Sequence, residues 1–152
     1  MPNIQDFQYS QTGKSTKIND MGMREMQERA FEQRNHPYLL LKAPPASGKS
    51  RALMFIALDK LQKQGLDKVI IAVPEMSIGG SFGKTELMSN GFFANWEPNP
   101  EFNLCTAGGD QSKVKAFHRF LDGDAKILIC THATLRFACE TLAESRFNNM
   151  LI

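Results

Sequence analysis

Residues 38–50 read Tyr38-Leu39-Leu40-Leu41-Lys42-Ala43-Pro44-Pro45-Ala46-Ser47-Gly48-Lys49-Ser50, and this stretch decides the fold. It places a short continuous apolar run, typical of a buried strand, before a small residue, four variable residues and Gly-Lys-Ser. A helical pattern follows at once. Strand, small residue, four variable positions, Gly-Lys-Ser/Thr and helix form, in that order, the pattern of a phosphate-binding loop. We therefore expect residues 43–50 to bind the phosphates of a nucleoside triphosphate.

Each part of this loop has a physical role in binding an anion. The main-chain N–H groups of residues 46–50 would surround the β-phosphate, and Gly48 would let the main chain come close. The helix that starts here points its positive end at the anion. Lys49 would neutralise charge on the β- and γ-phosphates, and the Ser50 hydroxyl would ligate Mg²⁺. The expected cofactor contacts in the loop are Pro45, Ala46, Ser47, Gly48, Lys49, Ser50 and Arg51, with Lys49 and Ser50 as candidate catalytic residues.

Helical and strand patterns alternate along the rest of the chain. A helix over residues 21–33, capped by Asn19 or Asp20, is predicted because Met23, Met26, Ala30 and Phe31 recur on one face. Further helices are expected over residues 49–64, where Gly65 ends the helix, and over 84–89, 110–121 and 133–143. Strands are expected at residues 38–41, 68–73, 102–106, 126–130 and 148–152.

The predicted strands are continuous apolar runs, which is the pattern of a parallel sheet covered by helices on both faces. We therefore expect an α/β fold in three layers, with a mainly parallel sheet and the phosphate loop at the carboxyl edge of its first strand. A chain of 152 residues is long enough for one domain with a hydrophobic core. Residues 1–19 are polar and lack a period, so we expect a flexible arm followed by one domain over residues 20–152.

The composition argues against several classes of protein. The net charge of +2 gives no basic footprint that would alone indicate nucleic-acid binding. No apolar run approaches the length of a membrane span and no apolar signal segment is seen, so we expect a soluble, cytoplasmic protein without a membrane partner. Cys105, Cys130 and Cys139 lie among apolar residues without the spacing of a metal site, and we expect buried, reduced thiols.

Two groups of residues admit both a structural and a functional interpretation. Phe92, Phe93 and Trp96 could stack on bases, but packing in the core or a lid is favoured. A helix carries Lys113, Lys115, His118 and Arg119, which could face a phosphate backbone. A solvated helix face is the favoured interpretation of these basic residues.

Several segments resemble, in order and spacing, those of superfamily 2 helicases, in particular the DEAD/DEAH-box and restriction-enzyme-type translocases. Upstream of the loop, Arg24-Glu25-Met26-Gln27 is similar to that family's Arg-x-x-Gln element, in which the Gln reads the adenine edge. The resemblance implies that Arg24 and Gln27 contact the nucleotide. A Gln amide suits this role, since it can donate to adenine N7 and accept from the N6 amino group.

Three downstream segments are similar to the family's nucleic-acid motifs. They are Val69-Ile70-Ile71-Ala72-Val73-Pro74-Glu75, Thr106-Ala107-Gly108-Gly109 and Cys130-Thr131-His132-Ala133-Thr134-Leu135. The resemblance implies a nucleic-acid interface at Pro74, Glu75, Gly108, Gly109, Thr131 and His132. Thr131 could also cap the following helix and present its N–H groups to a phosphate. Each segment is common as structure alone, and it is their order after the phosphate loop that favours the functional interpretation.

The resemblance spans about Met23 to Ile152 and implies a partial RecA-like ATP-binding domain of the P-loop NTPase class. That family carries an Asp-Glu pair at the end of its next strand, and residues 148–152 look like the start of such a strand. The pair, a second RecA-like domain and its arginine finger are not in the sequence, so we expect a truncated first motor domain. It would bind ATP and Mg²⁺, and nucleic acid weakly, without hydrolysing the nucleotide.

Two other functions fit the phosphate loop. A small nucleotide kinase can carry Pro-Pro-x-Ser-Gly-Lys-Ser, but its loop would normally lie at the extreme N-terminus, and lid arginines are not evident downstream. A non-catalytic module that senses ATP without hydrolysing it belongs to a different class. Phosphate transfer to AMP or a nucleoside would identify the kinase, and nucleic-acid-stimulated hydrolysis in a longer polypeptide would exclude the sensor.

Overall fold

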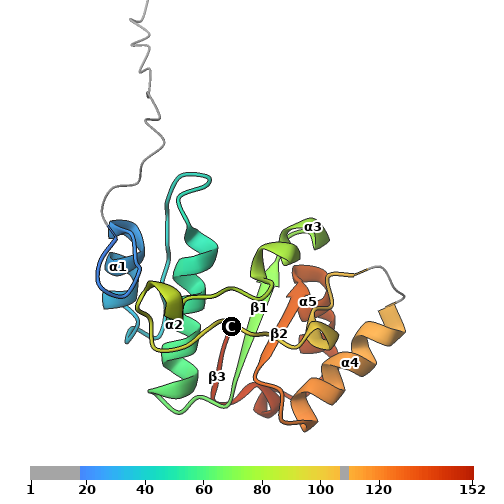
Figure 1. Cartoon of the computed structure of the whole chain (residues 1–152). Coiled ribbons are helices and arrows are strands. Elements are labelled where there is room, and N and C mark those ends of the chain that lie inside the picture. Colours follow the sequence, from blue (N-terminus) through green and yellow to red (C-terminus); the bar gives the residue numbers. More distant parts are fainter. Residues whose placement is uncertain (1–17, 107–109) are drawn as a thin grey trace, which may run out of the picture.

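Strand β1 (Lys68–Val73) lies at the centre of a three-stranded parallel sheet with the order β2-β1-β3 (Figure 1). Its neighbours are β2 (Ile127–Thr131) and β3 (Met150–Leu151). A computed structural model describes residues 18–106 and 110–152 of the chain. Its α-helices are α1 (Glu25–Glu32), α2 (Lys49–Gln62), α3 (Met76–Gly79), α4 (Asp110–Asp122) and α5 (His132–Thr141). The predicted α/β class and the parallel strands are confirmed.

Successive side chains of β1 point to opposite faces of the sheet, so both faces are apolar, and helices pack on both of them. Val69, Ile71 and Val73 pack in one apolar cluster with residues of α1 and α2. Ile70 packs in a second cluster with Phe117 and other residues of α4, α5 and β2. Both clusters are buried, which explains why β1 is a continuous apolar run.

Helix α1 begins four residues later than predicted. The predicted cap Asn19 instead forms a turn, in which its side-chain oxygen accepts hydrogen bonds from the main-chain N–H groups of Met21 (3.0 Å) and Met23 (2.9 Å). Gly22 has a left-handed conformation (φ 78°), which a helix cannot contain. Of the predicted apolar face, Ala30 and Phe31 are buried on the helix, Met26 is half-buried, and Met23 is buried but precedes the helix.

The predicted strand at residues 38–41 is wrong in this structure. These residues form no bridge to a described strand, and Tyr38 and Leu40 are each 93% exposed. An apolar run becomes a strand only where a neighbour satisfies its main-chain N–H and C=O groups. The strand predicted at residues 148–152 is reduced to Met150–Leu151, which pairs with Lys68 and Val69 of β1 and does not reach residues 38–41.

The strand predicted at residues 102–106 is also wrong. A 3-10 helix (η3, Pro100–Phe102) precedes a single parallel bridge between Asn103 and Ile129, supported by a 2.7 Å hydrogen bond from Leu104 N to Ile129 O. The 3-10 turn that Pro100 opens includes Phe102, and the Cys105 N–H donates to Asn103 Oδ1 at 3.1 Å and not to a neighbouring strand.

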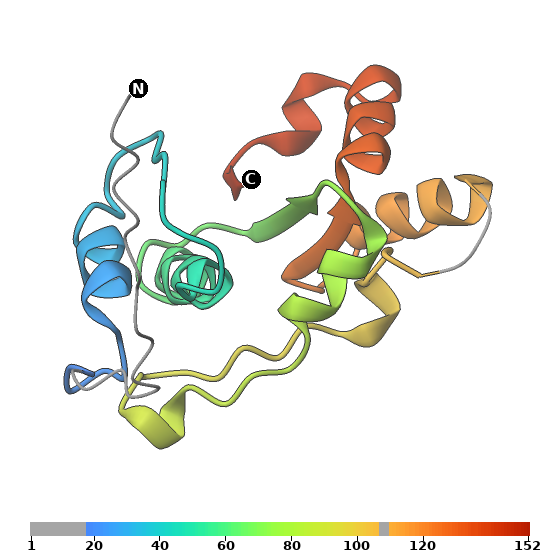
Figure 2. The same cartoon turned by 90° about the horizontal axis from the view of Figure 1, so that it is seen from above.

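Residues between α3 and η3 make a long excursion to the side of the molecule where α1 and α2 lie (Figure 2). They contain the 3-10 helices η1 (Gly80–Phe82) and η2 (Met88–Asn90), and the second replaces the helix predicted at residues 84–89. Thr85 and Trp96 form an antiparallel bridge, and the buried indole of Trp96 donates to the Phe82 carbonyl oxygen at 2.8 Å. The ring of Phe92 lies 4.7 Å from that of Phe55 in α2. Core packing of these aromatic residues is therefore confirmed.

The cysteines differ in exposure, contrary to the expectation that all are buried. Cys130 is fully buried in β2 and Cys105 is half-buried, whereas Cys139 is exposed on α5. Burial raises the pKa of the Cys130 thiol to about 12. In the described part of the chain, no helix is long and apolar enough to cross a membrane. The predicted arm falls mostly on residues 1–17, which lie outside the described residues.

Candidate functional site

The phosphate-loop sequence folds into a tight turn directly before α2. Ala46 (φ 59°) and Gly48 (φ 92°) both have left-handed main-chain conformations, and α2 begins at Lys49 as predicted. Only glycine adopts this conformation readily, and a side chain at position 48 would also have to displace the end of the Gln27 side chain. A Cβ atom there would lie 2.5 Å from Nε2 of Gln27. A turn of this kind, followed by a helix N-terminus, is the shape in which main-chain N–H groups surround an anion.

The Lys49 ammonium group folds back over the loop that precedes it. Its Nζ donates hydrogen bonds to the carbonyl oxygens of Ala43 (2.7 Å) and Pro44 (2.9 Å). A lysine ammonium carries three donors, so these two bonds leave it able to reach another acceptor. Within the described residues, the buried hydroxyl oxygen of Ser47 has no hydrogen-bond partner. The Lys49 ammonium and the N-terminus of α2 fit a phosphate, and the Ser50 hydroxyl oxygen is a ligand type that fits Mg²⁺.

Gln27 connects helix α1 to this loop. Its side chain is 2% exposed, and its Nε2 donates to the Gly48 carbonyl oxygen at 3.0 Å. Its Oε1 accepts from the main-chain N–H of Arg24 at 2.8 Å, which satisfies one of the donors at the start of α1. Each polar atom of the amide thus has one partner and one remaining hydrogen-bonding position.

A hollow of about 530 Å³ lies beside the loop and brings together most of the residues predicted to bind the cofactor. Seven of them line it: Arg24, Gln27, Ala46, Gly48, Lys49, Ser50 and Arg51. Pro45 and Ser47 belong to the loop but do not line the hollow. Sequence reasoning missed Ile18, Gly22 and Ser81, which complete the lining. Ser81 arrives from the 3-10 helix η1, and no sequence spacing relates it to the loop.

The carboxyl ends of β1 and β2 form a second candidate region on the same edge of the sheet. Val73 lies opposite Thr131, so Pro74 and Glu75 follow β1 beside the point where Thr131 ends β2. Thr131 Oγ1 accepts from the main-chain N–H of Thr134 at 3.3 Å, which confirms that Thr131 caps α5. Figure 1 shows α3 and the loop before α2 at the same end of the molecule.

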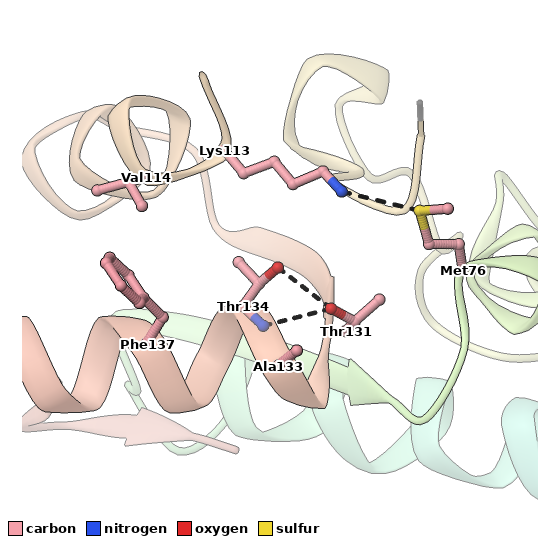
Figure 3. A pocket seen from close by; sticks show the side chains of 7 residues that line it. All are labelled: Met76, Lys113, Val114, Thr131, Ala133, Thr134 and Phe137. Carbon is pink, nitrogen blue, oxygen red and sulfur yellow. Dashed lines mark hydrogen bonds between the residues drawn. The ribbon is translucent and has the colours of Figure 1, made fainter. Parts of the chain in front are cut away.

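A hollow of about 350 Å³ opens at these strand ends (Figure 3). Its lining residues are Met76, Lys113, Val114, Thr131, Ala133, Thr134 and Phe137. Lys113 extends across it from α4, with Nζ 3.7 Å from the Met76 sulfur, and the Phe137 ring, 49% exposed, faces Val114. Sequence reasoning missed Phe137, and it assigned Lys113 to a solvated helix face, whereas Lys113 is half-buried here.

The residues predicted to contact nucleic acid are brought together only in part. Of Pro74, Glu75, Thr131 and His132, only Thr131 lines this hollow. Pro74, Glu75 and His132 are exposed around it, and Glu75 is acidic, which disfavours contact with a phosphate. Gly108 and Gly109 lie outside the described residues.

These observations define an α/β protein with a parallel sheet and with a candidate phosphate-binding loop directly before α2. Over all 152 residues, the chain is 64% identical to "Putative ATP-dependent helicase YeeB" of Bacillus subtilis (strain 168). The chain spans 25% of the length of that protein. No protein-family model matches the chain, and no solved structure matches it.

Proposed function

We propose that the chain is the ATP-binding part of an ATP-dependent nucleic-acid helicase or translocase. The observation that carries this proposal is the loop before α2, where Gly48, Lys49 and Ser50 stand at a helix N-terminus. The name of the Bacillus subtilis relative supports an ATP-dependent activity of this kind. The finer assignment, a partial RecA-like domain of the DEAD/DEAH-box or restriction-enzyme type over residues 20–152, rests on the order of the motifs.

In the proposed site, the residues that act on the nucleotide are among those that line the hollow. Lys49 would exchange the carbonyl oxygens of Ala43 and Pro44 for the β- and γ-phosphate oxygens, which carry more negative charge. Ser50 would hold Mg²⁺, and the ion, when bound, would neutralise charge shared between those phosphates. Gln27 would read the adenine edge through its remaining N–H and lone pair.

The proposed nucleic-acid interface lies at the carboxyl ends of β1 and β2. Lys113 offers a cation to a backbone phosphate, and Phe137 offers an exposed ring to a base. Thr131 orients the first turn of α5 toward the same hollow. Because the chain spans a quarter of its relative's length, we propose that a second RecA-like domain in a longer polypeptide completes the cleft.

We further propose that the 152-residue chain binds ATP without sustained turnover. Hydrolysis needs a positioned water and charge stabilisation on both sides of the γ-phosphate. Lys49 and Ser50 supply one side only. Phosphate release measured with and without single-stranded DNA or RNA tests this, with a Lys49→Ala variant to detect contaminating enzymes. Steady release that disappears in that variant would mean that a carboxylate of this chain, such as Glu75, completes the site.

The site itself is tested by calorimetry with MgATP. Lys49→Ala should lose most of the affinity, because it removes the charge that compensates two phosphates. Lys42→Ala is a matched control, since Lys42 is an exposed lysine of the same segment and does not line the hollow. Equal ATP affinity of Lys49→Ala and the parent would show that the site is misassigned. Phosphate transfer to AMP in the same preparation would instead identify a nucleotide kinase.

A further inference from the structure

Residues 80–99, which we call the crossing segment, run from α3 across the molecule to the turn that precedes α1 (Figure 2). The tip of this segment, η2 and Gly91, meets the turn main chain against main chain. Gly91 has a left-handed conformation (φ 101°), and a Cβ atom there would overlap the main-chain oxygen of Asp20. On the other side of the contact, a Cβ atom at Gly22 would lie 2.6 Å from Cβ of Asn90. A side chain on either glycine would therefore push the two segments apart.

The tip of the crossing segment is held in place by contacts that do not involve the turn. Oδ1 of Asn95 accepts hydrogen bonds from the main-chain N–H groups of Leu87 (2.8 Å) and Met88 (2.9 Å), where η2 begins. Directly after the tip, the buried Phe92 ring packs edge to face against Phe31 of α1, with 6.0 Å between the ring centres. The tip is thus anchored to the helical core, and the turn lies on a support with a fixed position.

The turn that the tip supports forms part of the hollow beside the phosphate loop. Four of the residues that line the hollow come from this turn and the start of α1, and we call them the base side: Ile18, Gly22, Arg24 and Gln27. Ile18 pairs with Arg24 in an antiparallel bridge, and the Arg24 N–H donates to Oε1 of Gln27. A shift of the turn would therefore move Gly22 and also the bridge that places Arg24 beside Gln27.

We propose that Gly91 is a positioning residue for the base side of the nucleotide site. It acts through the turn, since within the described part of the chain residues 88–91 do not themselves line the hollow. The phosphate side depends on other elements, because Gly48, Lys49 and Ser50 belong to the loop and to α2. The tip therefore controls how the base is bound and leaves the binding of the phosphates unchanged. This proposal rests on the proposed ATP-binding function of the chain.

Calorimetry of the full chain with MgATP and, separately, with magnesium tripolyphosphate distinguishes the two sides of the site. Tripolyphosphate carries the phosphates without a base, so the ratio of the two affinities reports on the base side. In Gly91→Ala, this ratio should fall about tenfold through a loss of ATP affinity. Partial unfolding of a variant lowers both affinities by the same factor and leaves the ratio unchanged.

Gly65→Ala is the matched control for this experiment. Gly65 is also left-handed (φ 70°), but no atom of the described residues lies within 4 Å of a Cβ atom there. The control therefore introduces the same main-chain strain without pushing on the turn, and it should keep the parent ratio. A ratio that falls equally in Gly65→Ala and Gly91→Ala would contradict the proposal, as would a parent ratio in Gly91→Ala.

A second pair of variants tests the support of the turn without a clash. Asn95→Ala removes the acceptor that holds the start of η2 and should lower the ratio about threefold, whereas Asn95→Asp retains an oxygen acceptor and should keep the parent ratio. If Gly91→Ala fails to fold and binds neither ligand, an unchanged ratio in Asn95→Ala overturns the proposal. A parent protein that binds neither ligand would instead contradict the proposed function. Equal parent affinities for both ligands would overturn the base side and leave the phosphate loop in place.

Discussion

The side-chain nitrogen of Gln27 donates a 3.0 Å hydrogen bond to the carbonyl oxygen of Gly48, the residue that precedes α2. The same amide accepts the main-chain N–H of Arg24, so one buried side chain both caps α1 and positions the phosphate loop. The contact requires glycine at position 48, because a Cβ atom there would lie 2.5 Å from the amide nitrogen. Gln27 therefore links the start of α1 to the phosphate loop.

Gln27→Ala is expected to weaken both the fold and nucleotide selectivity. The variant leaves the Arg24 N–H without its acceptor and removes one of the two hydrogen bonds of the Gly48 carbonyl oxygen, which keeps the bond from the Ala52 N–H, at a cost of about 1–3 kcal/mol in unfolding free energy. If Gln27 also reads adenine, the parent should prefer ATP over GTP by about 1–3 kcal/mol, and the variant should lose this preference. Urea unfolding and calorimetry with both nucleotides measure the two effects. Gln33→Ala, at an exposed position just after the same helix, should change neither quantity.

A parent protein with equal affinities for ATP and GTP would rule out adenine reading by Gln27. A variant that keeps the preference while losing stability would leave Gln27 with the structural role alone.

Asp59→Ala is expected to lower the unfolding free energy by about 2–3 kcal/mol, because it breaks a largely buried ion pair between α2 and Arg34, which follows α1. Oδ2 of Asp59 accepts from Arg34 Nε at 3.0 Å and from Gln64 Nε2 at 2.7 Å. Arg34 also lies 4.1 Å from the centre of the Phe31 ring, and this contact would keep its position without the charge partner. Urea unfolding measures the loss.

The matched control for Asp59 is Glu140→Ala, which removes the exposed pair with Arg136 on α5. Exposed pairs of this kind contribute about 0–1 kcal/mol. Equal destabilisation by both substitutions would contradict the anchoring role of Asp59.

Lys113→Ala tests the proposed nucleic-acid interface. Removing one phosphate contact should reduce the slope of log affinity against log salt by about 1 and weaken binding to all sequences alike. Fluorescence anisotropy with labelled single-stranded DNA and RNA at several salt concentrations measures both effects. Lys115→Ala is the control, because Lys115 is exposed on the same helix and does not line the hollow. Identical salt slopes for the two variants would show that Lys113 does not contact the nucleic acid.

The cysteines should react with a thiol reagent in the order of their exposure. At pH 8, Cys139 is expected to react quickly and Cys105 more slowly, since burial raises the Cys105 pKa. Cys130 should react only on unfolding, because burial raises its pKa from 9.0 to about 12 and its side chain has no access to solvent. Mass spectrometry of labelled peptides gives the order, and rapid labelling of Cys130 in the folded protein would contradict the described core.

The same pKa shift predicts a loss of stability at alkaline pH. Above pH 9 the unfolded thiol of Cys130 releases its proton while the folded one keeps it, so ionisation favours the unfolded state. Stability should then fall by about 1.4 kcal/mol per pH unit until the folded thiol also ionises. Cys130→Ala should remove this part of the decline, as measured by urea unfolding between pH 8 and 10.

The elements predicted correctly from the sequence are those whose pattern lies within a few consecutive residues. The start of α2 follows from Gly48-Lys49, and β1 and β2 follow from continuous apolar runs that a sheet buried on both faces requires. The predicted start of α1 is wrong because two residues, Asn19 and Gln27, could each accept the free N–H groups at the start of the helix. Asn19 has the residue type of a cap, but Gln27 reaches the start of the helix and Asn19 forms a turn.

Local composition and spacing were sufficient for the α/β class, for the start of α2 at Lys49 and for the capping role of Thr131, because each depends on neighbours within a few positions. Phosphate binding by residues 43–50 stays a prediction. The arrangement in space decided the rest. Ser81 and Lys113 reach their hollows from distant elements, and no spacing in the chain encodes that distance. The apolar run at residues 38–41 carries the composition of a strand, yet it is exposed here, because a strand exists only where another strand lies beside it and accepts its hydrogen bonds.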